Sequence, residues 1–266
     1  MVASSDTSAF IGLAIIVSGF ALLAGLELIR PVRLASQPKG RRWFTNLALF
    51  AVDTLSVRFL LPIAMVGMAI KAEQEGWGLF NAVAAPGWLA FAITLLALDL
   101  ALYVQHWATH RVPLLWRLHR VHHVDRDFDV TTAARFHPVE IVASMAWKVA
   151  VVAALGAPVA AVAIFEVGFA IFTLWTHANI SLPPALDLAV RKIIVTPDMH
   201  RIHHSVLMRE TNSNYGTVLS GWDRLFRTYR AMPRDRQRNM AIGLGQWQDD
   251  RPAQLAFSLW LPFARK

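Results

Sequence analysis

The ten histidines of this chain all lie between residues 106 and 204, and their spacing is typical of metal-binding sites. They include an HxxxH pair, two HxxHH triplets and two histidines between the triplets. The pair is His106 and His110, the triplets are His119, His122, His123 and His200, His203, His204, and the histidines between the triplets are His137 and His177. Imidazole is a good ligand for borderline metals such as iron and zinc. One ion binds roughly four to six ligands, so the eight histidines of the pair and the triplets predict two metal ions.

The spacing within each triplet predicts how its side chains are shared between the two ions. Residues three and four apart lie on the same face of a helix, whereas neighbours in sequence differ by about 100° around its axis. His122 and His123 therefore cannot easily reach the same ion. We expect one of them to reach the ion that His119 reaches and the other a second ion. Ordinary polar roles could explain one or two histidines, but not two identical triplets facing each other.

Four further side chains are expected to act at the site. Tyr103 and Asp99 continue the helix face of the HxxxH pair, one and two turns deeper respectively, where they could orient ligands or substrate. Ligating imidazoles usually donate their second N–H to a carboxylate or a carbonyl. Glu210 and Asn214, just beyond the last triplet, are the best candidates for that role.

The two remaining histidines are less clear from spacing. His177 ends an apolar stretch, at the membrane rim, which suits a ninth ligand or an interface histidine. His137 precedes Pro138 and Glu140, which fit the first and third positions of a helix. His137 is therefore either a helix N-cap or a further ligand.

The composition indicates a membrane protein. The chain has 266 residues, is 55% hydrophobic and has a mean hydropathy of +0.41, which is too apolar for an ordinary soluble domain. The absence of cysteine excludes disulfides, iron–sulfur clusters and thiolate-ligated haem. The net charge of +8 is carried by residues that flank apolar stretches, so it favours anionic lipid head groups over nucleic acid.

Five apolar stretches approach the roughly 20 residues needed to span a bilayer. They cover about 10–29, 46–70, 86–106, 139–156 and 158–177. The first lacks a basic start and a signal-peptidase site, so we interpret it as a retained transmembrane helix. We predict an all-α integral membrane protein with four to five transmembrane helices and a helical cap that carries the histidine motifs.

The loop charges predict the orientation. The first loop carries Arg30, Arg33, Lys39, Arg41 and Arg42. The second carries only Lys71, against Glu73 and Glu75. The positive-inside rule then places the first loop, and with it every histidine motif, at the cytoplasmic face.

The chain is expected to form a single membrane domain. Its parts are N-terminal helices at 10–70, a core at about 88–230 and a cytoplasmic tail at 231–266, within residues 1–266. The last two stretches predict a hairpin that turns at residues 156–158. Lys148 and Glu166 would then lie at the same depth and form an ion pair, because a lone lysine in lipid is costly.

Motifs of other enzyme classes are absent from the sequence. There is no HExxH of a zinc protease, no Glu-x-x-His of a ferritin-like site, no G-x-S-x-G, no phosphate loop and no dinucleotide fingerprint. No organic cofactor is therefore expected, and electrons for any redox reaction must come from another protein. An oxidative dimetal enzyme, a non-oxidative dizinc enzyme and a non-catalytic metal-binding membrane protein all remain open at this point.

The motifs HWATH (106–110), HRVHH (119–123) and HRIHH (200–204), in this order among apolar stretches, resemble those of the fatty acid hydroxylase/sterol desaturase superfamily. The similarity extends from about Asp99 to Tyr229, includes TTAARFHPVE (131–140), and is closest to the bacterial sterol desaturase-like branch. By this resemblance, the histidines of the pair, of the triplets and at 177 are metal ligands. His137 matches a histidine that only some branches have.

The resemblance also implies a reaction. Members of the superfamily use two iron ions, for which zinc can substitute, and O2 as co-substrate, to hydroxylate or desaturate lipids. Their substrates include fatty acyl chains, sterols and ornithine lipids. It further implies an electron donor of the ferredoxin or cytochrome b5 type with its reductase, and a location in a bacterial inner membrane.

Overall fold

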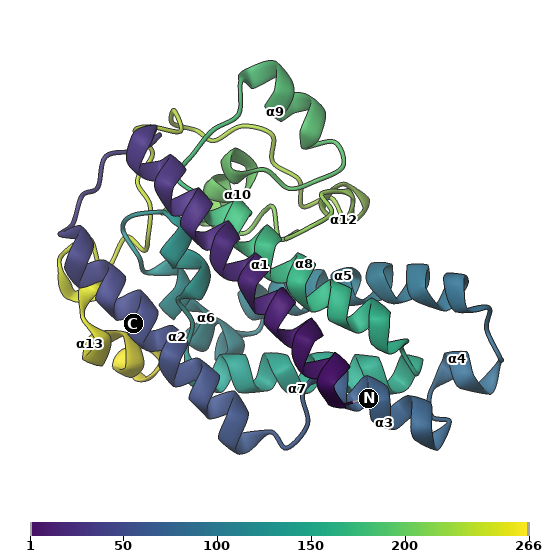
Figure 1. Cartoon of the computed structure of the whole chain (residues 1–266). Coiled ribbons are helices and arrows are strands. Elements are labelled where there is room, and N and C mark those ends of the chain that lie inside the picture. Colours follow the sequence, from purple (N-terminus) through teal and green to yellow (C-terminus); the bar gives the residue numbers. More distant parts are fainter. Residues whose placement is uncertain (1, 265–266) are drawn as a thin grey trace.

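The computed structural model describes residues 2–264, and this part of the chain is helical with no strand beyond isolated bridges. The α-helices are α1 (Val2–Ile29), α2 (Lys39–Leu60), α3 (Met65–Glu75), α4 (Leu79–Ala82), α5 (Gly87–Arg111), α6 (Pro113–His123), α7 (Pro138–Leu155), α8 (Val159–His177), α9 (Pro184–Val190), α10 (Pro197–His203), α11 (Met208–Thr211), α12 (Gly221–Leu225) and α13 (Leu255–Trp260). Short 3-10 helices are η1 (Val130–Ala134), η2 (Arg251–Ala253) and η3 (Leu261–Phe263). The predicted all-α fold is confirmed (Figure 1).

Five helical segments are long and apolar enough to cross a membrane, as predicted from the sequence. They are Phe10–Ile29, Lys39–Ala82, Gly87–Arg111, Pro138–Leu155 and Val159–His177. The second differs from the prediction of one helix over 46–70, because α2 ends at Leu60 and α3 begins at Met65. Pro62 lies in this gap, and a proline cannot donate the backbone hydrogen bond that a continuous helix needs.

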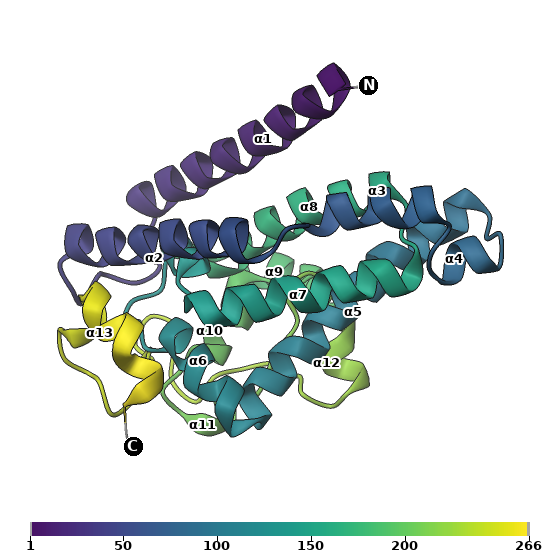
Figure 2. The same cartoon turned by 90° about the horizontal axis from the view of Figure 1, so that it is seen from below.

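The core of the bundle forms where α3, α5, α7 and α8 meet (Figures 1 and 2). Its buried side chains include Leu98 of α5, Val152 of α7 and Phe165 of α8. Helix α1 packs on α8, with Gly12 facing Val167 across the contact. Small residues allow such close approach between helices in a membrane.

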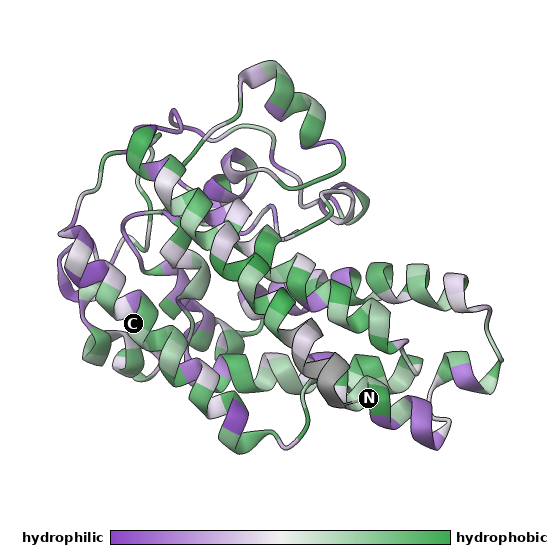
Figure 3. Ribbon diagram, viewed as in Figure 1, coloured by the Kyte–Doolittle hydropathy of each residue, from purple (hydrophilic) through white to green (hydrophobic). Residues whose placement is uncertain are grey.

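The outer faces of the long helices are apolar. Phe50, Phe59, Trp88 and Ile164 are all more than half exposed. Figure 3 shows hydrophobic residues along these helices and hydrophilic ones concentrated at the end that holds α10 and α13. So much exposed apolar surface suits lipid rather than water.

The predicted hairpin of α7 and α8 turns at Gly156, which adopts a left-handed φ of 63°. The predicted contact between Lys148 and Glu166 is not found: no ion pair joins these two described residues within 4.0 Å. They interact electrostatically at longer range. The Lys148 ammonium instead lies 5.7 Å from the centre of the Phe169 ring.

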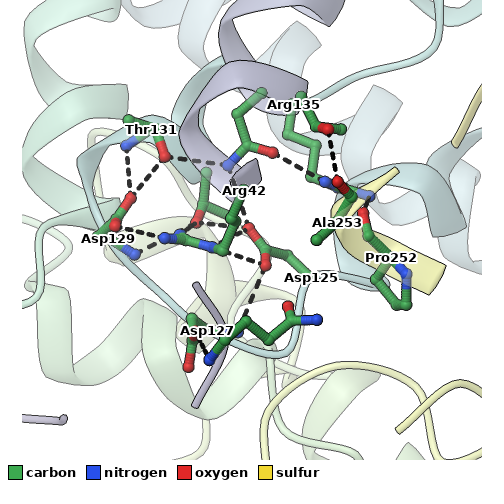
Figure 4. A network of polar contacts seen from close by, with 12 residues as sticks. Arg42, Asp125, Asp127, Asp129, Thr131, Arg135, Pro252 and Ala253 are labelled. Atoms are coloured by element: carbon green, nitrogen blue, oxygen red, sulfur yellow. Dashed lines mark hydrogen bonds and ion pairs between the residues drawn. The ribbon is translucent and has the colours of Figure 1, made fainter. Parts of the chain in front are cut away.

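A buried polar network joins the bundle to the histidine-rich end (Figure 4). Arg42 of α2 donates to Asp125 at 2.8 Å and to Asp129 at 2.5 Å. Arg135 donates to Asn46 of α2 and, on its other side, to the carbonyl of Pro252 and to Ser258. The segment after α6 is thereby held between α2 and the C-terminal segment.

Candidate metal centre

The helices bring nine of the ten histidines together in two adjacent groups. The first is His106, His110, His119, His123 and His203, and the second is His122, His177, His200 and His204. Within each group, the candidate ligand atoms lie within 4.8 Å of one another. Both triplets are divided between the groups, as helical spacing predicts: one supplies His119 and His123 to the first group and His122 to the second.

Three histidines of the first group are oriented by hydrogen bonds at Nδ1. The acceptors are the carbonyl of Tyr215 for His106 (2.7 Å), Glu140 Oε1 for His119 (2.6 Å) and the carbonyl of Ser213 for His203 (2.7 Å). An Nδ1 that donates its hydrogen leaves a lone pair at Nε2. All three Nε2 atoms are buried and have no hydrogen-bond partner. These groups fit a metal ion, which would accept the converging lone pairs.

In the second group, two Nε2 atoms that both carry lone pairs lie close together. His122 Nδ1 donates to the carbonyl of Arg135 at 3.1 Å, and His177 Nδ1 donates to the carbonyl of Thr173 at 2.8 Å. Their Nε2 atoms therefore both carry lone pairs, yet they lie only 3.1 Å apart. Two nitrogens that each lie about 2.1 Å from one ion at a right angle are about 3 Å apart. A shared cation explains this contact, whereas two facing lone pairs alone would repel.

Burial keeps five of these imidazoles neutral. Desolvation lowers the pKa of His203 to about 3. Desolvation, followed by repulsion from neighbouring histidines, lowers the pKa of His122, His123, His200 and His204 well below 6.5. Metal binding requires the neutral form, so the rings are ready to bind a cation at physiological pH.

Aromatic rings enclose the two groups. Phe136 stacks on His122 with a centroid distance of 4.4 Å, and Phe128 lies over His177 at 5.6 Å. Trp116 and Tyr215 cover the ring of His110 at 4.9 and 5.1 Å. These wall residues could not be predicted from the sequence, because an aromatic residue in an apolar segment carries no signal that separates a site wall from ordinary core.

Asp99 and Tyr103 both form hydrogen bonds to the segment that follows the second triplet. Asp99 Oδ2 accepts hydrogen bonds from Trp222 Nε1 at 2.8 Å and from the backbone of Leu219 at 3.2 Å. The Tyr103 hydroxyl is 2.8 Å from Thr228 Oγ1. Both side chains thus fasten the loop of residues 211–230 to α5, and neither belongs to a histidine group.

Glu210 and Asn214 form hydrogen bonds within the segment after the second triplet instead of bonding to an imidazole. Glu210 Oε1 accepts from the backbone of Arg234 at 2.5 Å. The Asn214 amide donates to the carbonyls of Met199 and Arg230. Asn214 itself has a left-handed φ of 55°, a conformation that asparagine tolerates well. It lies between the two residues whose carbonyls accept from His203 and His106, so its effect on the site is indirect.

Two carboxylates outside the predicted site residues contribute to the site. Glu140 fits a helix start in the sequence, but its side chain is also the hydrogen-bond partner of His119. Asp223 accepts from the backbone of Tyr215 and Gly216 and from the Thr228 hydroxyl, and so shapes the loop. Glu140 could have been suspected from the need of ligating imidazoles for carboxylate partners. Nothing local marks Asp223.

His137 lies outside both histidine groups. Its Nδ1 accepts from the backbone N–H of Val139 at 3.2 Å, at the N-cap of α7. Its Nε2 lies 3.3 Å from the carbonyl of Leu259. Of the two roles considered for His137, the structure therefore shows the capping role and gives no support to the ligand role.

Comparison with known proteins connects this geometry to a family. The family model described as fatty acid hydroxylase matches residues 91–228, which include both histidine groups. The chain is 33% identical to the ornithine lipid hydroxylase OlsE of Rhizobium tropici over 262 residues, which cover 94% of this chain and 74% of that protein. It is 28% identical to human alkylglycerol monooxygenase over 216 residues, or 80% of this chain.

The match to the human enzyme covers only 46% of that protein, so this chain spans less than half of it. A similar relationship holds for alkylglycerol monooxygenase of Xenopus tropicalis, at 27% identity over 72% of this chain. No solved structure matches the chain. The family match and the coverage of the Rhizobium protein establish the relationship: this chain belongs to the fatty acid hydroxylase family.

Proposed function

We propose that this protein is a membrane-bound, O2-dependent di-iron oxygenase that hydroxylates a lipid. The observation that carries the proposal is the division of nine histidines into two adjacent groups with converging lone pairs. In this proposal those nine histidines are the metal ligands and His137 is not. The names of the relatives, an ornithine lipid hydroxylase and alkylglycerol monooxygenases, favour hydroxylation over desaturation and a membrane lipid as substrate.

The residues of the chain provide orientation and a dry environment. The hydrogen bonds at Nδ1 fix the tautomers of His106, His119 and His203, so that each Nε2 is available as a ligand atom. Neutral ligands leave the positive charge of the ions uncompensated. When bound, iron would supply the O2 chemistry needed to attack an unactivated C–H bond. The aromatic walls exclude water from this region and so limit side reactions.

An apolar cavity of about 310 Å³ between α5, α6 and α7 supports a lipid substrate. Its lining includes Val104, Leu115, Leu118 and Trp147, and also Glu140, the partner of His119. A lipid chain lying there would be beside the first histidine group, held by apolar contacts on membrane helices. Positioning of this kind accounts for a large part of catalysis when an inert carbon must be presented to an oxidant.

The proposal also assigns an electron donor and a location in the membrane. The chain has no sequence motif for a flavin or nicotinamide, so we assign reduction to a separate donor of the ferredoxin or cytochrome b5 type with its reductase. The basic first loop lies at the same end as the histidines. By the positive-inside rule that end faces the cytoplasm, and we place the protein in a bacterial inner membrane.

Metal analysis and lipid analysis test the proposal. Protein purified without oxygen should contain two iron ions per chain, visible by Mössbauer spectroscopy, and oxygen uptake should accompany lipid oxidation. Cells with the gene should contain a lipid that is heavier by one oxygen; loss of two hydrogens instead would indicate desaturation. His122→Ala should lower the iron content and abolish turnover. Two zinc ions without oxygen uptake would favour a non-oxidative enzyme, and bound metal with no change in any lipid would favour a metal-binding protein.

A further inference from the structure

A second pocket, lined in part by charged residues, lies where α1 ends and α2 begins, with a volume of about 180 Å³. Its lining comes from the end of α1, the basic first loop, the start of α2 and the segment after α6. It includes three acidic residues, Glu27, Asp127 and Asp129, and three basic residues, Arg33, Lys39 and Arg42. The mixture of charges raises the question of which of them already have partners.

The acidic groups are all bonded within the protein. Glu27 Oε1 accepts from the backbone of Val130 at 2.8 Å and of Asn179 at 2.6 Å. Asp127 accepts from the backbone of Ser36 and Gln37. Asp129 accepts from Arg42, which is itself neutralised, as Figure 4 shows. Asp127 and Asp129 are therefore already paired, and Glu27 keeps a single buried oxygen, Oε2, without a hydrogen-bond partner.

Two of the cations are not neutralised in this way. Lys39 has no hydrogen bond or ion pair among the described residues, and its ammonium lies 4.7 Å from the centre of the Trp43 ring. It feels the buried Glu27 only as a more distant charge. The Arg33 guanidinium donates to one carbonyl, that of Gln237, and contacts no carboxylate. The pocket therefore has two basic groups available for an anion.

The rim of the pocket is apolar. Leu28, at the end of the membrane helix α1, is 68% exposed, and Leu34, in the loop, is 88% exposed. Apolar side chains beside free cations at the end of a membrane helix are complementary to an amphiphile. A soluble anion would gain nothing from them.

The inner wall of the pocket leads to the metal centre. Phe128 lines the pocket, and its ring lies 5.6 Å from the ring of His177 and 5.0 Å from that of His204, measured between centroids. A single aromatic ring thus separates the pocket from the second histidine group. A molecule bound there would be anchored close to the site of reaction.

We propose that this pocket binds the anionic part, a carboxylate or a phosphate, of a lipid head group, through Lys39 and Arg33. The inference rests on the proposed function in one respect only, namely that the lipid is the substrate. It narrows the substrate class to lipids with an anionic head group. The acyl chains of that lipid would leave the pocket past Leu28 and Leu34 into the bilayer.

Direct binding to the purified, metal-loaded protein tests this. Phosphatidylglycerol and diacylglycerol are the probes, and retained lipid is counted by native mass spectrometry without oxygen or reductant. Lys39→Gln should weaken phosphatidylglycerol binding by about tenfold or more, as expected for losing a hydrogen bond to a charged group. Lys39→Arg should restore it. Diacylglycerol, which has no anionic group, should bind equally to all variants.

Arg41→Gln is the matched control, because Arg41 lies in the same helical turn, is exposed and does not line the pocket. An equal loss in Arg41→Gln and Lys39→Gln would mean general surface attraction and would overturn the proposal. Inorganic phosphate that binds as tightly as phosphatidylglycerol would make this a site for soluble anions and would also overturn it. Protein that oxidises lipid but shows no binding dependent on Lys39 would refute the pocket while leaving the catalytic proposal intact.

Discussion

At the scale of single residues, the site depends on what lies behind each imidazole. His119 is the one histidine of the first group whose Nδ1 partner is a carboxylate, Glu140. Backbone carbonyls serve His106 and His203. A carboxylate partner raises the basicity of a ligand more than a carbonyl does and adds negative charge near an otherwise neutral ligand set.

Glu140→Ala should therefore lower iron affinity or turnover by about 10- to 100-fold, the usual effect of removing a partner of a ligating histidine. Glu140→Gln, which keeps an acceptor oxygen, should be milder. Iron content and turnover should be measured together. Glu75→Gln makes the same charge change at an exposed position at the other end of the bundle and serves as control. Equal iron content and turnover in wild type and Glu140→Ala would contradict this role.

His137 and His123 should separate capping from ligation. His137→Ala removes the N-cap of α7 and should destabilise the fold by about 1 kcal/mol, with iron content unchanged. His123→Ala removes a buried member of the first group and should release iron. Thermal unfolding and metal analysis of both variants check this. Release of iron from His137→Ala would place His137 among the ligands.

The sequence revealed the imidazoles but not most of their partners. The division of the triplets follows from the geometry of one helical turn, so it could be predicted. The carbonyls of Ser213 and Tyr215 could not, because every residue has a carbonyl. Their direction depends on the left-handed backbone of Asn214 and on hydrogen bonds to Asp223, eight residues beyond Tyr215, and no sequence motif marks either feature.

At the scale of elements, the turn between α7 and α8 packs closely against the turn that follows α3. This contact fixes how α7 and α8 lie on α3. Gly156 ends α7 with a positive φ, and a side chain there would collide with the carbonyl oxygen of Trp77. Gly78 in turn packs against the backbone of Gly156. The sequence predicted the turn from its glycine and proline, but not the partner turn, because nothing local connects residues 78 and 156.

Gly156→Ala should destabilise the protein by about 1–2 kcal/mol from the left-handed conformation alone, with the collision adding to this. The thermal unfolding midpoint in detergent should fall accordingly. Gly168→Ala is the control, because it lies within α8, where a Cβ would meet no atom within 4 Å. Equal midpoints for wild type and Gly156→Ala would contradict this, because they would show that the two turns can move apart without loss of stability.

The ion pair between Arg42 and Asp129 should make the free energy of unfolding depend on pH in the acidic range. Burial alone would raise the pKa of Asp129, but Arg42 and the hydrogen bonds from Thr131 and Trp43 outweigh it and hold the pKa at about 2, below the usual 3.8. The unfolded chain then binds the proton first as the pH falls. The stabilisation, on the order of 2 kcal/mol, is complete above about pH 4 and is lost between about pH 4 and pH 2.

Asp129→Asn should remove this contribution. The variant should be less stable than wild type at pH 7, and the difference between the two should shrink as the pH falls from about 4 to about 2. Buried histidines also take up protons on acidification, so only the difference between the two proteins is informative. A constant difference across that range would contradict the assignment.

At the scale of the whole molecule, composition and apolar length were enough to predict the bundle, because lipid imposes helices of a minimum length. They were not enough to show the break between α2 and α3 or the packing of the C-terminal segment. Leu244, Trp247 and Leu261 of that segment pack against Val121 and Val124 at the end of α6. The C-terminal segment thus supports α6, the helix that carries the first triplet. This packing joins residues far apart in the sequence, so it could not be predicted from local patterns.

We predict that the end of the bundle that holds the histidine groups faces the cytoplasm. The first loop and the histidine groups lie at one end of the bundle, and α4 lies at the other (Figure 2). Because the chain has no cysteine, a single introduced cysteine reports its own position. Gln246→Cys, exposed at the histidine end, should react with an impermeant maleimide in inside-out vesicles but not in spheroplasts of a bacterial host. Glu75→Cys should behave in the opposite way. The reverse pattern would place the site outside, where cytoplasmic electron donors could not reach it.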